Sequence, residues 1–216
     1  MGVGNVGGYL TRYEDGDTFL TRDGGVKWEE VRKGAHLHEI GDQGAILVVV
    51  DDEQATDKVW YSFDEGASWH SLIITSNGER VRVKDIATVP GGISRRFLLW
   101  GHVIGEFSKE IAVHLDFTGL LGRKCQLDIN NADDDDFELW TLKRPSGESC
   151  VFGREVKYNR RIRGRKCYIG NEIVQPKEIV KNCTCTEYDF EWQVERNVFR
   201  FIILGMFLLI YLIIMF

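Results

Sequence analysis

The chain has 216 residues, of which 44% are hydrophobic and 28% are charged, a balance typical of folded globular proteins and not of disordered chains. Its formal net charge is −6, so nucleic-acid binding, which depends on lysine and arginine side chains against phosphates, is disfavoured. Residues 1–17 lack the basic and apolar regions of a secretory signal peptide.

The first 117 residues predict β-structure. Short runs rich in Val, Ile, Phe and Trp alternate with turns of Gly, Asp and Asn, and no segment of helical periodicity interrupts them. From Thr118 to Glu195 the chain is more charged and contains the cysteines, which indicates a boundary near residue 120. The strands we expect are Asp17–Leu20, Trp28–Arg32, Ala45–Val50, Lys58–Phe63, Trp69–Ile74, Val81–Val89, Phe97–Val103 and Glu110–Phe117.

An internal repeat organises this first part. The pattern [Ser/Thr]-x-Asp-x-Gly-x-x-Trp, the Asp box, begins at Thr21 and again 41 residues later at Ser62, a period that suits one four-stranded propeller blade. The hydroxyl and the carboxylate bond backbone groups of a turn, the glycine permits a left-handed backbone, and the tryptophan is expected to be buried in the sheet. We interpret the pattern residues as turn architecture and not as catalytic groups: Thr21, Asp23, Gly25, Trp28, Ser62, Asp64, Gly66 and Trp69.

Five cysteines lie within residues 125–185. Zinc sites use paired C-x₂-C spacings, and only Cys183 and Cys185 come near that spacing, so structural disulfides are the preferred interpretation over a metal site. Asn182-Cys183-Thr184 is an N-glycosylation sequon, whose use requires a lumenal location.

Three charged or metal-like clusters receive structural interpretations. The acidic run Asp133–Asp136 lacks the alternating ligand spacing of a calcium loop and predicts a solvated turn. His36 and His38 fall on one face of a strand without a third ligand, which predicts a surface pair. The basic run of residues 160–166 predicts a solvated face and not a nucleic-acid site. We expect no metal, no cofactor and no catalytic residues.

The last part of the sequence is strongly apolar. Phe201–Phe216 carries no charge, and a helix of this length spans about 24 Å, against roughly 30 Å for a hydrocarbon core. We interpret this segment as a membrane anchor. A buried terminal helix and an artefact of a truncated reading frame are the alternatives.

Several motifs together resemble the sortilin-type vacuolar protein sorting receptors. In that family a ten-bladed propeller binds cargo peptides in the Golgi or endosomal lumen, and a ten-cysteine module braces it. The resemblance covers roughly residues 2–191, which correspond to the last two or three blades and the first half of the module. The motifs are Gly4–Leu10, Asp17–Leu20, Val48–Glu53, Trp60–Phe63, His114–Leu120, Arg123–Cys125, Asp135–Trp140 and Asn182–Glu191.

This resemblance implies a mainly β chain with three parts. Residues 1–120 would be terminal blades of a partial β-propeller, residues 121–195 the first half of the disulfide-containing module, and residues 199–216 a transmembrane or tail-anchor helix. The implied function is non-catalytic sorting of protein or peptide cargo between Golgi, endosome and vacuole. The implied disulfides are Cys125–Cys167 and Cys150–Cys183, and Cys185 is left unpaired.

Some alternatives stay open at this point. Asp boxes also occur in sialidases, and a non-functional partial receptor copy is a third interpretation. An incomplete set of blades exposes its edges, so we expect low stability alone or pairing with other blades. The missing signal peptide, with Arg196 and Arg200 before the apolar run, favours a cytosolic tail-anchored orientation, whereas the disulfides and the sequon favour the lumen.

Overall fold

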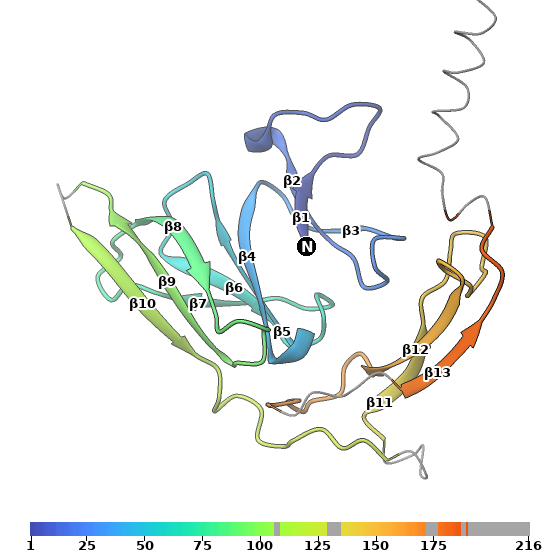
Figure 1. The fold of residues 1–216 in the computed structure, drawn as a ribbon. Helices are drawn as coiled ribbons and strands as arrows, with labels where there is room; N and C mark the ends of the chain where they lie inside the picture. The colour runs from blue at the N-terminus through green and yellow to red at the C-terminus, as the bar shows by residue number, and fades with distance from the viewer. Residues whose placement is uncertain (106–108, 129–134, 172–176, 187–188, 190–216) are drawn as a thin grey trace, which may run out of the picture. The chain divides into compact units, whose positions relative to one another are not determined.

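A computed structural model describes residues 1–105, 109–128, 135–171, 177–186 and 189 (Figure 1). The chain divides into two compact units. Unit 1 contains Met1–Trp140 and Tyr158–Pro176, and unit 2 contains Thr141–Lys157 and Lys177–Phe216.

The described residues form four sheets, in which the pairs β1–β2, β2–β3, β4–β5, β5–β6, β6–β7, β8–β9, β9–β10 and β12–β13 are antiparallel. Their orders are β1-β2-β3, β4-β5-β6-β7, β10-β9-β8 and β11-β12-β13 (Figure 1). Two short 3-10 turns also occur, η1 (Tyr13–Asp15) and η2 (Asp42–Gly44). The strands are β1 (Gly2–Gly4), β2 (Asp17–Leu20), β3 (Glu29–Arg32), β4 (His36–Gly41), β5 (Ile46–Asp51), β6 (Lys58–Ser62), β7 (His70–Ile73), β8 (Val81–Ala87), β9 (Arg96–Val103), β10 (Glu110–Asp116), β11 (Phe137–Thr141), β12 (Arg154–Arg161) and β13 (Lys177–Asn182).

The main core of unit 1 lies on the second and third of these sheets. Strand β5 is apolar from Ile46 to Val50 and pairs on both sides, so Val48 and Val50 are fully buried. Phe117 follows β10 and packs against Tyr61 of β6 with ring centroids 5.0 Å apart. Each such side chain stabilises the fold by about 1.5–3 kcal/mol through its burial. This core fixes the β6–β7 hairpin that carries the second Asp box.

The prediction of a mainly β chain is confirmed, and each of the eight expected strands has a counterpart in the structure. The prediction did not include β1, β4 or the strands after residue 117. Strand β4 (HLHEIG) was not among the expected strands, although His36 and His38 were placed on one strand face, because Ile40 is its only β-branched residue. The described residues form no closed propeller.

Among the residues that the structure describes, no helix is long and apolar enough to cross a membrane. The expected anchor, Phe201–Phe216, lies outside the described residues.

Candidate functional site in the Asp-box turns

The first Asp box forms a closed turn between β2 and β3. The Thr21 hydroxyl donates to an Asp23 carboxylate oxygen at 2.9 Å and accepts the Gly25 N–H at 2.8 Å. The same Asp23 oxygen accepts the Lys27 N–H at 2.9 Å. Gly25 has a φ of +96°, a backbone conformation that L side chains rarely adopt. Backbone hydrogen bonds, led by the one from Lys27, lower the pKa of Asp23.

The second box, between β6 and β7, repeats this arrangement. The Ser62 hydroxyl donates to Asp64 at 2.8 Å and accepts the Gly66 N–H at 2.9 Å. Asp64 accepts the Ser68 N–H at 2.8 Å and the Ser68 hydroxyl at 2.5 Å. Burial raises the pKa of Asp64, but the hydrogen bonds from Ser68 and Ser62 outweigh it and hold the pKa below its usual range. Both boxes therefore use their polar groups inside the turn.

The two box tryptophans differ in environment. Trp69 is partly buried, and the Arg32 guanidinium lies 5.9 Å from its ring centroid and 3.7 Å from that of Trp60. Trp28 is 51% exposed, so the expectation that it is buried is wrong. Its neighbour on β1 is Gly2, which offers no side chain to cover the ring.

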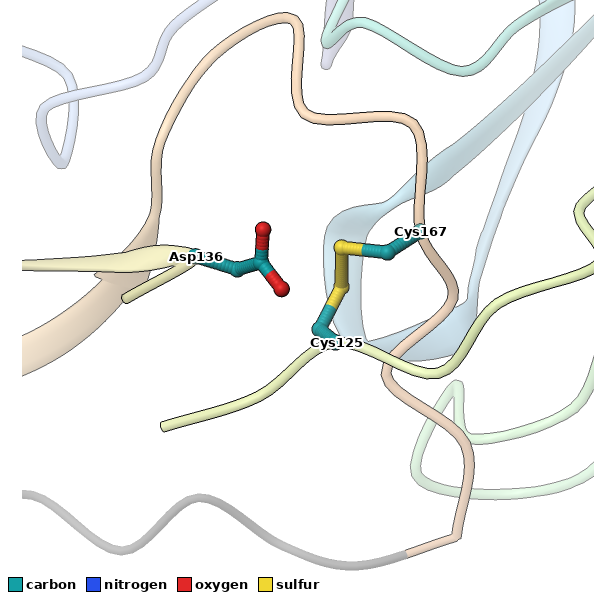
Figure 2. Close-up of side chains that lie close together, drawn as sticks. All are labelled: Cys125, Asp136 and Cys167. Atoms are coloured by element: carbon teal, nitrogen blue, oxygen red, sulfur yellow. A yellow bond between two sulfur atoms is a disulfide. The ribbon is translucent and has the colours of Figure 1, made fainter. Parts of the chain in front are cut away.

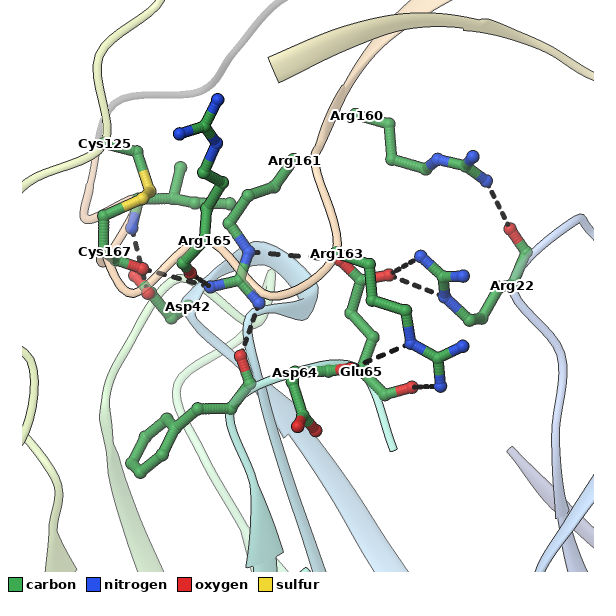
Figure 3. Close-up of polar contacts among 12 residues, drawn as sticks. Arg22, Asp42, Asp64, Glu65, Cys125, Arg160, Arg161, Arg163, Arg165 and Cys167 are labelled. Atoms are coloured by element: carbon green, nitrogen blue, oxygen red, sulfur yellow. Dashed lines mark hydrogen bonds and ion pairs between the residues drawn. A yellow bond between two sulfur atoms is a disulfide. The ribbon is translucent and has the colours of Figure 1, made fainter. Parts of the chain in front are cut away.

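Arginines at the end of β12 and just after it donate hydrogen bonds to backbone carbonyls of the two boxes (Figure 3). Arg160 donates to the Arg22 carbonyl of the first box at 3.3 Å. Arg163 donates to the carbonyls of Asp64 and Glu65 in the second box, at 3.2 and 3.4 Å. The expectation of a solvated basic face is wrong for Arg161, which is buried, whereas Arg163, Arg165 and Lys166 are exposed.

Arg161 is the most buried member of this cluster, with 4% of its surface exposed. It donates to the Phe63 carbonyl at 2.6 Å and to the carbonyls of Arg165 and Cys167 at 3.1 Å each. Its Nε lies 3.9 Å from a Glu65 carboxylate oxygen and has no hydrogen-bond partner among the described residues. Burial lowers the pKa of Arg161, while the nearby carboxylates, Glu65 foremost, oppose that shift. One buried cation thus joins the second box to the loop that follows β12.

The two boxes are also joined to each other. Arg22 of the first box donates through its Nε to Glu65 of the second at 2.7 Å, and its Nη2 contacts the same oxygen (Figure 3). Both side chains are mostly buried, at 24% and 15% exposure, so this pair is less screened than a surface ion pair.

A second connection starts at η2, the turn between β4 and β5. Asp42 is fully buried and accepts the N–H groups of Ile169 and Gly170 at 2.9 and 2.6 Å. Gln43 donates from its side chain to the Gly170 carbonyl at 3.1 Å. Asp42 has a φ of +48°, and aspartate tolerates this left-handed conformation better than most residues. The turn therefore holds the segment that contains Cys167.

Two disulfides form in the structure, Cys125–Cys167 in unit 1 and Cys150–Cys183 in unit 2, with Cα–Cα distances of 4.9 and 6.2 Å. These are the pairs that the resemblance implies. Cys185 is a free, exposed thiol.

Asp136 lies beside the first disulfide, within 4.8 Å of both sulfurs (Figure 2). Because a metal needs free thiolates and these sulfurs are bonded to each other, the cluster is unsuited to a metal. Asp136 instead accepts two hydrogen bonds from Arg123, at 2.6 and 2.8 Å, and the Gln126 N–H at 2.9 Å. The Arg123 guanidinium holds the pKa of Asp136 below its usual range.

Two other expectations about charged groups are corrected. Asp136 is 2% exposed, so the prediction of a solvated acidic turn is wrong for this residue, and Asp133 lies outside the described residues. His36 is 7% exposed, and its Nδ1 lies 3.1 Å from the Thr18 hydroxyl and 3.0 Å from the Gly34 carbonyl, so it is not a surface residue.

Unit 2 has its own buried ion pair. Arg144 contacts Asp189, whose carboxylate also accepts the N–H groups of Phe152 and Thr186 at 2.7 Å each. Asn182, the sequon residue, is exposed at the end of β13.

Comparison with known families matches nearly the whole chain. The family described as "Sortilin, neurotensin receptor 3" matches residues 1–86, and the one described as "Sortilin, neurotensin receptor 3, C-terminal" matches residues 88–196. The chain belongs to the sortilin family. Among its relatives is the vacuolar protein sorting/targeting protein 10 of Mycosarcoma maydis, 53% identical over 200 residues. The proteins of that name in Laccaria bicolor and Debaryomyces hansenii are 46% and 44% identical over 191 and 203 residues.

The alignments cover 88–93% of this sortilin-type chain but only 12–13% of those relatives. Sequence reasoning missed three residues that hold the boxes and the first disulfide in place: Asp42, Arg123 and Arg161. The signal for Asp42 was the Asp-Gln-Gly turn between two strands. Arg123 and Arg161 had no local signal, because their partners lie elsewhere in the chain.

Proposed function

We propose that this chain is part of the lumenal, non-catalytic region of a receptor that carries protein or peptide cargo between Golgi, endosome and vacuole. In this proposal residues 1–120 are terminal propeller blades, residues 121–195 are the first half of a ten-cysteine module, and Phe201–Phe216 anchors the chain in a membrane. The relatives are named as vacuolar sorting proteins, which supports the sorting role.

One observation carries the proposal. The segment that ends at the Cys125–Cys167 disulfide supplies Arg161, and Arg161 holds the second Asp box by its Phe63 carbonyl. A disulfide that supports the turns of a binding scaffold suits an oxidising, lumenal compartment. The box carboxylates are satisfied within their turns, which suits a binding scaffold more than a catalytic one. Two arginines beside the second box, Arg161 and Arg163, donate to backbone carbonyls of its turn, which does not favour the sialidase alternative.

The test is a secretion assay in the native cell. We expect disruption of the gene to release vacuolar proteins into the medium, and the unmodified gene to restore their retention. Cys167→Ser should fail to restore it, whereas Cys185→Ser, which removes the exposed free thiol, should restore it. Normal retention of vacuolar proteins after disruption would contradict the sorting function.

A further inference from the structure

A pocket of about 360 Å³ lies within unit 1 beside the Arg22–Glu65 ion pair. Its apolar surface comes from side chains of β4, β5 and β11 and of the loop before Gly170: Ile40, Leu47, Phe137 and Ile169. Cavities of about 150 Å³ hold one benzene ring, and small-molecule sites begin at about 300 Å³. The pocket therefore has room for a body of two fused rings.

One wall of the pocket is aromatic. The ring centroids of Trp140 and Tyr158 lie 6.3 Å apart. The Arg160 guanidinium lies 4.8 Å from the Trp140 ring centroid. Tyr158 is 41% exposed, so part of this apolar wall is uncovered. Small-molecule sites are lined mainly by apolar and aromatic side chains, with a few polar or charged groups that fix the orientation of the ligand.

The charge of the lining favours an anion. Three arginines line the pocket, Arg22, Arg160 and Arg161, against a single carboxylate, Glu65, which Arg22 already contacts. Arg160 donates to Glu138 through both Nε, at 2.9 Å, and Nη2, at 2.6 Å. Glu138 does not line the pocket and is 45% exposed, so solvent weakens that pair and a ligand carboxylate can replace it. An arginine beside an apolar wall can bind a carboxylate through two parallel hydrogen bonds.

We infer that this pocket binds a small aromatic carboxylate. Its two-ring body lies against Trp140, Tyr158 and the apolar side chains, and its carboxylate accepts hydrogen bonds from Arg160. The inference does not depend on the proposed sorting function, since it rests only on the size, apolarity and charge of the pocket.

Calorimetric titration of the full 216-residue chain with 2-naphthoate tests this inference. We expect saturable one-to-one binding, weakened about tenfold or more when 2-naphthamide, which lacks the charge, replaces the acid. Arg160→Gln should weaken naphthoate binding by a similar factor. Arg163→Gln is the matched control, because Arg163 also donates to box carbonyls but does not line the pocket, and it should leave affinity unchanged.

The comparison of 2-naphthoate with 2-naphthamide uses the unmodified chain, so it tests the inference even if Arg160→Gln does not fold. Absence of saturable heat up to the solubility limit of naphthoate would overturn the inference. Equal binding of the acid and the amide would overturn it as well, because the arginines would then have no role in binding.

Discussion

Replacing Arg161 by methionine tests the connection between the second Asp box and the loop after β12. The change keeps much of the volume of a side chain that is 4% exposed and removes three donated hydrogen bonds, to the carbonyls of Phe63, Arg165 and Cys167. Each bond from a charged donor contributes about 1.5–3 kcal/mol. Removing the buried cation also removes its desolvation cost, which offsets several kcal/mol. We expect a net loss of about 2–4 kcal/mol in the free energy of unfolding.

The assay is urea unfolding followed by tryptophan fluorescence, under conditions that keep both disulfides closed. Arg165→Met is the matched control, because that side chain is 42% exposed and its carboxylate partner, Asp136, lies 3.9 Å away. The control should change stability by at most about 0.5 kcal/mol. If Arg161→Met loses no more stability than Arg165→Met, the hydrogen bonds of Arg161 do not hold the box, and the reasoning is refuted.

Three further predictions concern the second Asp box, the stability of the chain at low pH and the glycosylation sequon. Asp64→Ala should destabilise the chain by about 1–3 kcal/mol in urea unfolding, since it leaves the Ser68 N–H and two hydroxyls without their acceptor. The control is Asp52→Ala, at a half-buried carboxylate that accepts a hydrogen bond from the Tyr13 hydroxyl, and a loss at Asp64 no greater than the loss at Asp52 would contradict this prediction. The pKa of Asp136 is lower in the folded state, so its ionised form stabilises the fold above the unfolded pKa of about 3.9, and this stability is lost as pH falls through the lower folded value. Measurement of the free energy of unfolding between neutral and acid pH should show this loss, and Asp136→Asn should reduce the pH dependence. Asn182 is exposed, so glycosidase treatment should increase the gel mobility of the native protein but not of Asn182→Gln, and equal mobility of treated and untreated protein would count against a glycan.

The Asp-box turns were predictable because their chemistry is local. Thr21, Asp23 and Gly25 contact one another and their immediate neighbours, so a pattern within eight residues contains nearly all of the information. The core strands were predictable for the same reason, because a buried strand such as Ile46–Asp51 shows its apolarity in its own sequence.

The connections that position the boxes were not predictable from local patterns. Arg161 lies 98 positions from Phe63, and Asp42 lies 127 from Ile169, so neither partner can be identified by spacing. A run of arginines is normally solvated, and the sequence gives no sign that backbone carbonyls of distant turns accept its donors. Asp136 was misjudged likewise, because its burial depends on two hydrogen bonds from Arg123, 13 positions away.

Counting free thiols in the natively expressed protein, with a mass-tagging maleimide before and after reduction, tests the central claim most directly. The account predicts one reactive thiol, Cys185, rising to five on reduction, because Cys125–Cys167 and Cys150–Cys183 are closed in the folded receptor segment. Five reactive thiols before reduction would contradict it, since the arginine segment that holds the Asp boxes would then lack its disulfide and the lumenal sorting role would lose its support.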